Sequence, residues 1–200
     1  MKYEITMIGD FQCPYCYMAK MTIDKLKKDY DLTISFMGFE IHPETPEKGI
    51  DAEDYFNDPE GLENQIKSFS DKYGIVFNLN EKMPNTNKAL QVAEYAKEVN
   101  KSEEYNVAMY KARYVDAINI SRVEEIKKIA TSVGLTEKEV DDVLFGDKYR
   151  HILEENKRFC YRHKFNSVPT FIINDKIAII GMQPAEAFTD AFKKLETKEA

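Results

Sequence analysis

Residues 2–8 alternate hydrophobic and polar side chains, and Tyr3, Ile5 and Met7 fall on the same side of the alternation. A period of two is typical of a β-strand with one buried face. Gly9-Asp10 interrupts the alternation and indicates a turn. The chain therefore opens with a predicted strand that ends shortly before Cys13.

A helical period follows this turn. The hydrophobic stripe consists of Ala19, Ile23, Leu26 and Tyr30. A recurrence every three or four positions places these side chains on one buried face of a helix that begins near Cys13. Residues 32–41 form a second apolar stretch, and Pro43 and Pro46 end it. The first 40 residues thus predict strand, turn, helix and strand.

Residues 58–150 differ from the start of the chain, because they lack β-type alternation and carry several helical stripes. The stripes are Ala89, Val92, Ala93 and Ala96; Tyr105, Ala108, Met109 and Ala112; and Val123, Ile126, Ala130 and Val133. Ser121-x-x-Glu124 and Thr136-x-x-Glu139 match the capping box, in which each residue satisfies a backbone donor of the other. Gly134 is placed to end the helix between them. We expect an all-helical unit of four or five helices here.

Strand character returns at the end of the chain. Thr170–Ile173 and Ile177–Ile180 are short apolar runs, and Asn174-Asp175 between them predicts a tight hairpin turn. Pro184 then opens a final helix, whose apolar stripe is Phe188, Ala191, Phe192 and Leu195. We therefore predict an α/β fold in which residues 1–57 and 151–200 form one discontinuous domain, interrupted by a helical insertion of residues 58–150.

Composition narrows the function classes. The 200 residues carry 28 Lys and Arg against 35 Asp and Glu, a formal charge of −7. Nucleic-acid binding needs clustered cations, so we expect no nucleic-acid partner. The first apolar stretch is shorter than a secretion signal, and the other apolar runs are far below a membrane span. We expect a cytoplasmic protein without membrane attachment.

The cysteines carry the candidate chemistry. There are three, too few for a disulfide scaffold, and two of them form Cys13-Pro14-Tyr15-Cys16 at the predicted helix start. A helix N-terminus leaves backbone N–H groups unpaired and carries partial positive charge, which stabilises a thiolate. A thiolate attacks a disulfide sulfur and gives a mixed disulfide. We predict Cys13 as the nucleophile and Cys16 as the thiol that resolves the mixed disulfide.

A structural zinc site is a competing interpretation of the same pair. Cys160-x-x-His163 would complete three thiolates and an imidazole, a ligand set that zinc uses. A further alternative is that the two cysteines are simply buried side chains without a chemical role.

The whole chain resembles the DsbA family of thiol–disulfide oxidoreductases and, within it, the cytosolic FrnE-like branch. The matching segments are Asp10-Phe11-x-Cys13-Pro14-Tyr15-Cys16-Tyr17, Asn85-Thr86, Tyr95-Ala96-Lys97-Glu98, Val168-Pro169-Thr170-Phe171 and Gly181-x-Gln183-Pro184. The most specific part is the Cys pair together with the downstream Val168-Pro169-Thr170. The resemblance implies a thioredoxin-like fold with an inserted helical domain.

The resemblance also implies that Pro169 follows a cis peptide bond and lies beside Cys13. Val168 would then present its backbone to an extended substrate, and Pro14, Tyr15, Val168 and Pro169 would be the substrate contacts. In extracytoplasmic DsbA a histidine lies between the cysteines, whereas Tyr15 brings no positive charge. Pro-Tyr is typical of glutaredoxins. We therefore expect a weaker oxidant than DsbA, acting as reductase or isomerase, with glutathione as a possible co-substrate and no other cofactor or metal.

Other residues invite weaker hypotheses. Cys160 shares a helical stripe with Leu153 and is expected in the core, although a regulatory thiol is the alternative. Glu40 is expected to face solvent from the second strand; the alternative is a buried proton acceptor for Cys16. His42 and His151 are expected at the surface. FrnE-like chains often carry a His-Arg pair where Leu90-Gln91 stands, so no substrate contact is assigned to the insertion.

The alternative function is a glutathione-dependent isomerase or kappa-type glutathione transferase of the same superfamily. Those enzymes usually have serine at the position of Cys13, and an isomerase has no use for a resolving thiol. Retention of both cysteines favours disulfide exchange with protein or small-molecule thiols and disulfides. The sequence leaves the physiological substrate, the electron donor and the oligomeric state open.

Overall fold

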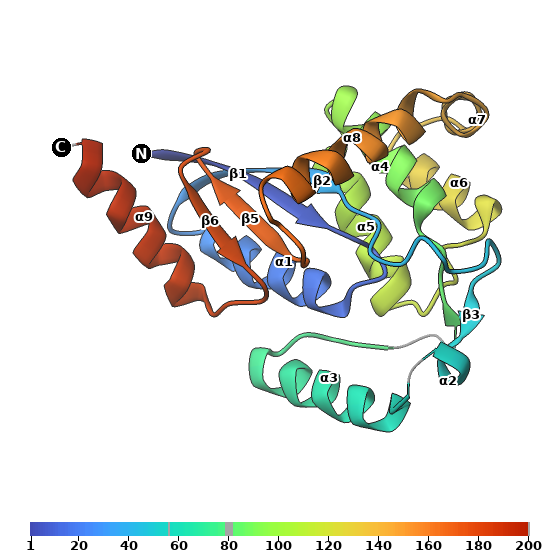
Figure 1. Ribbon diagram of the computed structural model, residues 1–200, viewed down its shortest axis with the longest axis horizontal. Coiled ribbons are helices and arrows are strands. Elements are labelled where there is room, and N and C mark those ends of the chain that lie inside the picture. Colours follow the sequence, from blue (N-terminus) through green and yellow to red (C-terminus); the bar gives the residue numbers. More distant parts are fainter. Residues whose placement is uncertain (56, 79–81, 200) are drawn as a thin grey trace.

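The computed structural model describes residues 1–55, 57–78 and 82–199 (Figure 1). The strands are β1 (Lys2–Gly9), β2 (Asp31–Gly38), β3 (Ile50–Asp51), β4 (Lys82–Met83), β5 (Thr170–Ile173) and β6 (Ile177–Ile180). The helices are α1 (Pro14–Leu26), α2 (Ala52–Tyr55), α3 (Pro59–Tyr73), α4 (Asn87–Glu98), α5 (Ser102–Tyr114), α6 (Val123–Ser132), α7 (Glu137–Phe145), α8 (Lys148–Arg162) and α9 (Ala185–Glu199).

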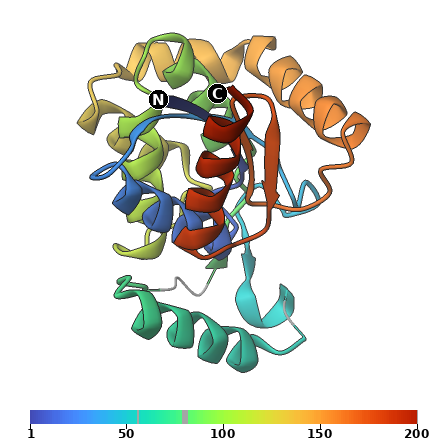
Figure 2. The ribbon, with the colours of Figure 1, turned by 90° about the vertical axis from the view of Figure 1, so that its left-hand side faces the viewer.

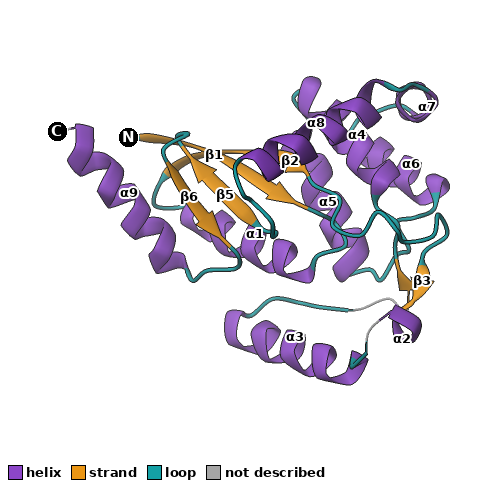
Figure 3. Cartoon of the chain, viewed as in Figure 1, coloured by secondary structure: helices purple, strands orange, loops and turns teal. Residues whose placement is uncertain are grey.

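A four-stranded sheet in the order β2-β1-β5-β6 joins the two ends of the chain (Figure 3). β1 runs parallel to β2 and antiparallel to β5, and β5 and β6 form an antiparallel hairpin. Asn174 and Asp175 both have positive φ, as the predicted tight turn requires. The mixed sheet with helices on it confirms the predicted α/β, thioredoxin-like class.

The predicted alternation in β1 is confirmed by burial, since Tyr3, Ile5 and Met7 all belong to the main hydrophobic core. α9 packs on this face, where the rings of Tyr3 and Phe192 stack with centroids 4.1 Å apart. Ile8 points to the other face and packs with Phe39 and Cys160 of α8 in a second, smaller cluster. The sheet is therefore covered on both faces by helices.

α4 is the central helix of the middle segment, because it contacts α5, α6, α7, α8 and β2. α3 lies apart from these helices, on the side where α1 begins, in both views (Figures 1 and 2). The segment 58–150 contains α3–α7, and it also contains β4, which pairs with β3 and was not predicted. The division of the chain into domains at 57/58 and 150/151 stays a prediction.

The two predicted capping boxes had different outcomes. Thr136 and Glu139 form both bonds of the box at the start of α7, and Gly134, with φ +92°, follows the end of α6. The box at Ser121 is wrong, because α6 begins after Arg122 without a side-chain cap. The Ser121 hydroxyl instead accepts a hydrogen bond from the backbone N–H of Asn85, at 2.8 Å.

The first helix and the second strand are shorter than predicted. α1 ends at Leu26, so Tyr30 lies beyond it, and β2 ends at Gly38 rather than at residue 41. Side chains take the backbone donors at this end of β2: Glu94 accepts from Gly38 N at 2.8 Å, and Asp10 accepts from Ile41 N at 2.9 Å. Among the residues described, no helix is both long and apolar enough to cross a membrane.

Candidate active site

Cys13 is the residue immediately before α1, and Pro14 occupies the first helical position. The backbone bends sharply here, because Cys13 N donates to Asp10 O at 3.2 Å and Cys16 N donates to Cys13 O at 3.1 Å. Gly9 precedes the bend, and a Cβ there would lie 3.4 Å from Cys16 Sγ and 3.1 Å from a ring carbon of Phe36. The sequence therefore sets Cys13 at the positive end of α1 and Cys16 one turn inside it.

Both thiols are free and differ in environment. Cys13 is 5% exposed, whereas Cys16 is completely buried. Burial raises the pKa of Cys16 well above its usual 9.0, and the hydrogen bond and the charge of Cys13 raise it further. Cys16 is thus held in its protonated, thiol form.

The loop before β5 lies against Cys13. The Cys13 thiol donates to the carbonyl oxygen of Val168 at 3.7 Å, and the peptide bond between Val168 and Pro169 is cis. β6 fixes this loop from the other side, because Gly181 N donates to Pro169 O at 2.8 Å. Residues 155 positions apart in the sequence are thereby brought together at one sulfur.

Asp10 organises the other side of the site and is fully buried. Its carboxylate accepts from Gln12 N at 3.0 Å, Ile41 N at 2.9 Å and Thr86 Oγ1 at 2.6 Å, so it joins three segments of the chain. Burial raises the pKa of Asp10, and these hydrogen bonds act in the opposite direction. Its charge also adds to the rise of the Cys16 pKa.

Tyr15 points away from this network, toward α3. Its hydroxyl donates to Gln65 Oε1 at 2.5 Å, and its ring meets Phe69 edge-on with centroids 6.2 Å apart. Burial and the charge of Cys13 raise the pKa of Tyr15. α3 therefore contacts the active-site helix through the residue that lies between the two cysteines.

With this geometry in view, sequence comparison assigns the family. The family model of the DSBA-like thioredoxin domain matches residues 4–193. The chain belongs to this family. It is also 28% identical, over 100% of its own length and 98% of the other protein, to the uncharacterized protein YwbO of Bacillus subtilis.

Solved structures share the fold of this DsbA-like domain. A probable DsbA oxidoreductase from Streptomyces coelicolor superposes with TM-score 0.84 and 20% identity, over 96% of this chain and 89% of that one. A 2-hydroxychromene-2-carboxylate isomerase superposes with TM-score 0.80 and 18% identity, over 98% of this chain and 97% of that one. The cytosolic disulfide reductase DsbM of Pseudomonas aeruginosa, solved with GSH, superposes with TM-score 0.68 and 15% identity, over 96% of this chain and 99% of that one.

Glu40 differs from the sequence expectation. It lies two residues beyond the end of β2 and is half-buried, so it is not a solvent-facing strand residue. Its carboxylate accepts from Asn87 Nδ2 at 3.0 Å, and Gln91 Nε2 donates to Asn87 Oδ1 at 2.7 Å. Burial raises the pKa of Glu40. The fully buried carboxylate next to the thiols is that of Asp10, for which the sequence predicted only a place in the turn after the first strand.

The zinc interpretation does not hold. Cys160 lies in the second cluster, on the opposite face of the sheet from the Cys13–Cys16 pair, and the His163 ring packs 4.4 Å from that of Phe159. No three His, Cys, Asp or Glu side chains among the described residues are grouped so that they could hold a metal ion. Of the other histidines, His151 is exposed and His42 is half exposed beside Glu44.

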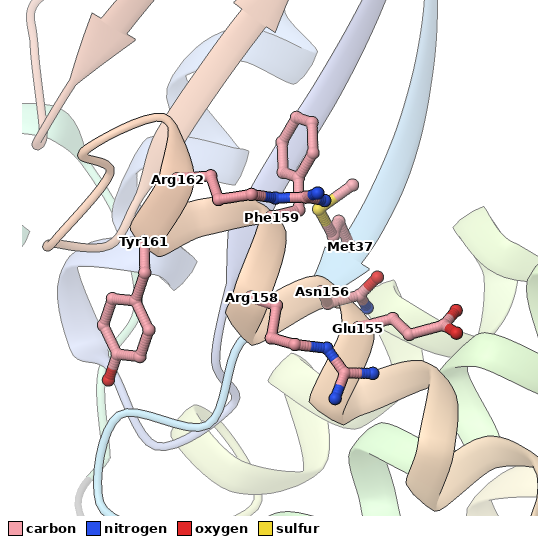
Figure 4. A pocket seen from close by; sticks show the side chains of 7 residues that line it. All are labelled: Met37, Glu155, Asn156, Arg158, Phe159, Tyr161 and Arg162. Atoms are coloured by element: carbon pink, nitrogen blue, oxygen red, sulfur yellow. The ribbon is translucent and has the colours of Figure 1, made fainter.

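A hollow of about 640 Å³ lies between α8 and the end of β2, away from the thiols. Figure 4 shows the side chains that line it, among them those of Arg158, Tyr161 and Arg162 of α8. None of the predicted site residues lines this hollow. It is therefore separate from the disulfide chemistry predicted from the sequence.

Proposed function

We propose that this DsbA-like domain is a thiol–disulfide oxidoreductase that works through Cys13 and Cys16, with glutathione as co-substrate. The observation that carries the proposal is the position of Cys13. Its sulfur lies at the N-terminus of α1, 3.7 Å from the carbonyl of Val168, with the buried thiol of Cys16 one turn away. A nucleophile, a resolving thiol and a backbone contact for substrate therefore meet at one point.

Reduction of a substrate disulfide takes two steps. The Cys13 thiolate attacks one sulfur, the substrate S–S bond breaks, and the departing thiolate takes a proton from solvent. Cys16 then gives its proton to solvent and attacks Cys13 Sγ, so the mixed disulfide breaks and the second substrate thiol leaves. The substrate gains two electrons, and the protein is left with a Cys13–Cys16 disulfide. Two glutathione molecules restore the dithiol and become glutathione disulfide.

The raised pKa of Cys16 gives the two thiols different roles in this scheme. Cys16 stays protonated until the mixed disulfide forms, so Cys13 is the sulfur that attacks first. Pro14 and Tyr15 on one side and Val168 and Pro169 on the other would contact the substrate around it. Extended substrate backbone would lie along Val168.

Tyr15 supports a reducing direction. It contributes no positive charge beside Cys13, and its hydroxyl is engaged by Gln65 of α3. The dithiol form is therefore less stabilised than in a DsbA with a histidine at this place, which makes the protein a weaker oxidant. We propose that it acts as reductase or disulfide isomerase in the cytosol, where the thiol pool is reducing. The similarity in fold to DsbM, which is named as a cytosolic disulfide reductase, supports this proposal.

Acid trapping tests the proposed steps. Reduced protein is mixed with glutathione disulfide, quenched with acid, alkylated with a maleimide and analysed by mass spectrometry. Wild type should form the Cys13–Cys16 disulfide, and Cys16→Ser should accumulate a glutathione adduct on Cys13. Cys160→Ala serves as the matched control and should behave as wild type. Absence of any adduct on Cys16→Ser would contradict the scheme.

Equilibration with glutathione buffers tests the direction. We expect a reduction potential more negative than about −200 mV, in the range of glutaredoxins and thioredoxin. A value near that of DsbA, about −120 mV, would show an oxidant and would refute the reductase assignment.

A glutathione-dependent isomerase or transferase is the second candidate, favoured by the similarity in fold to 2-hydroxychromene-2-carboxylate isomerase. The two functions differ in their need for Cys16. An isomerase that only holds glutathione should keep full activity in Cys16→Ser, whereas disulfide turnover requires the resolving thiol. Isomerisation of a 2-hydroxychromene-2-carboxylate by wild type, without disulfide turnover, would favour the second candidate.

A further inference from the structure

Arg113, in the last turn of α5, is a buried cation, and it has no anionic partner among the residues that the structure describes. It is 1% exposed, and its Nη2 donates to the thioether sulfur of Met83, at 3.9 Å. Within the part of the chain that the structure describes, Arg113 Nε and Nη1 have no hydrogen-bond partner. The hydroxyl of the next residue, Tyr114, is also buried and equally lacks a partner there.

Such a pair of residues is unusual in a protein interior. A guanidinium is always charged, and buried charges are normally paired because desolvation is otherwise uncompensated. Buried polar atoms are in the large majority hydrogen-bonded, so each exception needs an explanation. Burial lowers the pKa of Arg113 and raises that of Tyr114. Both residues therefore offer donors that no acceptor among the described residues uses.

This place adjoins the active site on two sides. The Arg113 guanidinium lies 5.2 Å from the centre of the Tyr114 ring, and that ring stacks at 5.3 Å on Tyr17, the residue after Cys16. On the other side, Met83 precedes Pro84, whose carbonyl accepts from Gln12 Nε2 at 3.0 Å. Gln12 in turn precedes Cys13. Only one layer of side chains therefore separates Arg113 from the segments that carry the thiols.

We propose that Arg113 and Tyr114 bind a carboxylate of the substrate, which is a small thiol or disulfide that carries one, such as glutathione. The planar guanidinium matches a carboxylate with parallel N–H donors, and the Tyr114 hydroxyl adds a further donor. This inference rests on the proposed function. It makes charge on the substrate, rather than its disulfide alone, a determinant of specificity.

Binding requires the side chain over Tyr114 to move. The Phe77 ring lies 4.8 Å from that of Tyr114, and Asn78 N donates to Tyr114 O at 2.6 Å. The incoming carboxylate replaces the contact of Phe77 with Tyr114 and reaches the guanidinium behind it.

The first test uses S-methylglutathione, which has the carboxylates of glutathione but no free thiol for exchange. Its dissociation constant is measured by calorimetry on wild type, Arg113→Met and Tyr114→Phe. We expect binding about tenfold weaker or worse in Arg113→Met, and a smaller loss in Tyr114→Phe. Arg158→Met is the matched control, because it removes the same charge from the exposed hollow of Figure 4, and it should bind as wild type does.

The second test compares two disulfides by the second-order rate constant with which each oxidises the reduced Cys13–Cys16 pair. For glutathione disulfide, this rate constant should fall about tenfold or more in Arg113→Met, whereas for the neutral hydroxyethyl disulfide it should stay within twofold of wild type. If wild type turned over neither disulfide, the proposed function would fail. If wild type reacted with both disulfides and Arg113→Met reacted with both equally fast, the proposed function would stand and the carboxylate site at Arg113 would be refuted.

Stability supplies the remaining check. Arg113→Met should melt at or above the temperature of wild type, because it removes an unpaired buried charge. A marked fall in melting temperature, or failure to fold, would show that the guanidinium is paired within the chain and would overturn the proposal. Loss of S-methylglutathione binding in Arg158→Met with binding unchanged in Arg113→Met would place the ligand at α8 and would also overturn it.

Discussion

The chain buries cysteines at two helix ends, and the two places differ in chemistry. Cys13 precedes α1, at the positive end of the helix dipole, with Cys16 and Val168 O at its sulfur. Cys160 lies in the last turn of α8, at the negative end, among Ile8 and Phe39. Burial raises the pKa of Cys160 to about 11. Burial alone therefore produces an inert thiol, and the helix end and its neighbours decide whether chemistry is available.

The largest difference between the two places is expected in activity, when the sulfur of Cys13 or of Cys160 is removed. Cys13→Ala should lower the protein-catalysed rate of hydroxyethyl disulfide reduction by glutathione about a thousandfold or more, because the attacking atom is lost. Cys160→Ala, the matched control, should stay within twofold of wild type in a coupled assay with glutathione reductase and NADPH. Loss of activity in Cys160→Ala, with an unchanged melting curve, would give Cys160 a role that the structure does not show.

Alkylation of Cys160 sharpens the contrast. A thiol with a pKa of about 11 has only about one thiolate in ten thousand at pH 7, about 100-fold fewer than a cysteine with the usual pKa of 9.0. Iodoacetamide should therefore label Cys160 at least a hundredfold more slowly in the folded Cys13→Ser/Cys16→Ser variant than in the same chain in urea. Peptide mass spectrometry gives the rates. Equal rates would mean that α8 does not protect Cys160.

Stability against pH reports on Cys16. Its folded pKa is raised, so between pH 9 and the folded pKa the folded chain keeps a proton that the unfolded chain releases at about 9.0. The stabilising effect is complete below pH 9 and is lost as the pH rises, by at most about 1.4 kcal/mol per unit.

Urea unfolding of the reduced protein between pH 8 and 10 measures this loss. Cys16→Ala should show a flatter decline than wild type. The Cys160→Ala variant should also be flatter, since Cys160 has a shift of the same sign up to about 11. Identical slopes for wild type and Cys16→Ala would contradict the raised pKa of Cys16.

The smallest effect is expected where α3 contacts Tyr15. Tyr15→Phe removes the hydrogen bond to Gln65 and should weaken the packing of α3 against α1 by about 1 kcal/mol, with little change in global stability. Hydrogen exchange should be faster in α3 only. Tyr161→Phe, on the exposed face of α8, is the control and should leave α3 unchanged. Unchanged exchange in Tyr15→Phe would mean that other contacts hold α3.

Local sequence pattern predicted the elements whose signals lie within a few residues. The alternation of Tyr3, Ile5 and Met7 gave β1, the Asn174-Asp175 turn gave the β5–β6 hairpin, and Cys13-Pro14 gave the start of α1. Each rests on backbone periodicity or on the geometry of a single turn. The family followed from the same short segments, and the match over residues 4–193 confirms it.

Interactions between distant segments were not predictable in this way. The end of β2 depends on Glu94 and Asp10, and Ser121 serves Asn85 instead of its own helix. In each case a side chain competes for a backbone donor far away in the sequence. A sequence pattern over a few neighbouring residues carries no information about that competition.

What the sequence alone determined is therefore the fold class, the family and the pair of thiols, because helix and strand periods and a helix start are local properties. Only the tertiary structure decided that Asp10 joins three segments, that Tyr15 meets α3, and that Arg113 Nε and Nη1 are buried without a hydrogen-bond partner among the described residues. These are properties of burial, and burial depends on which distant segments pack together.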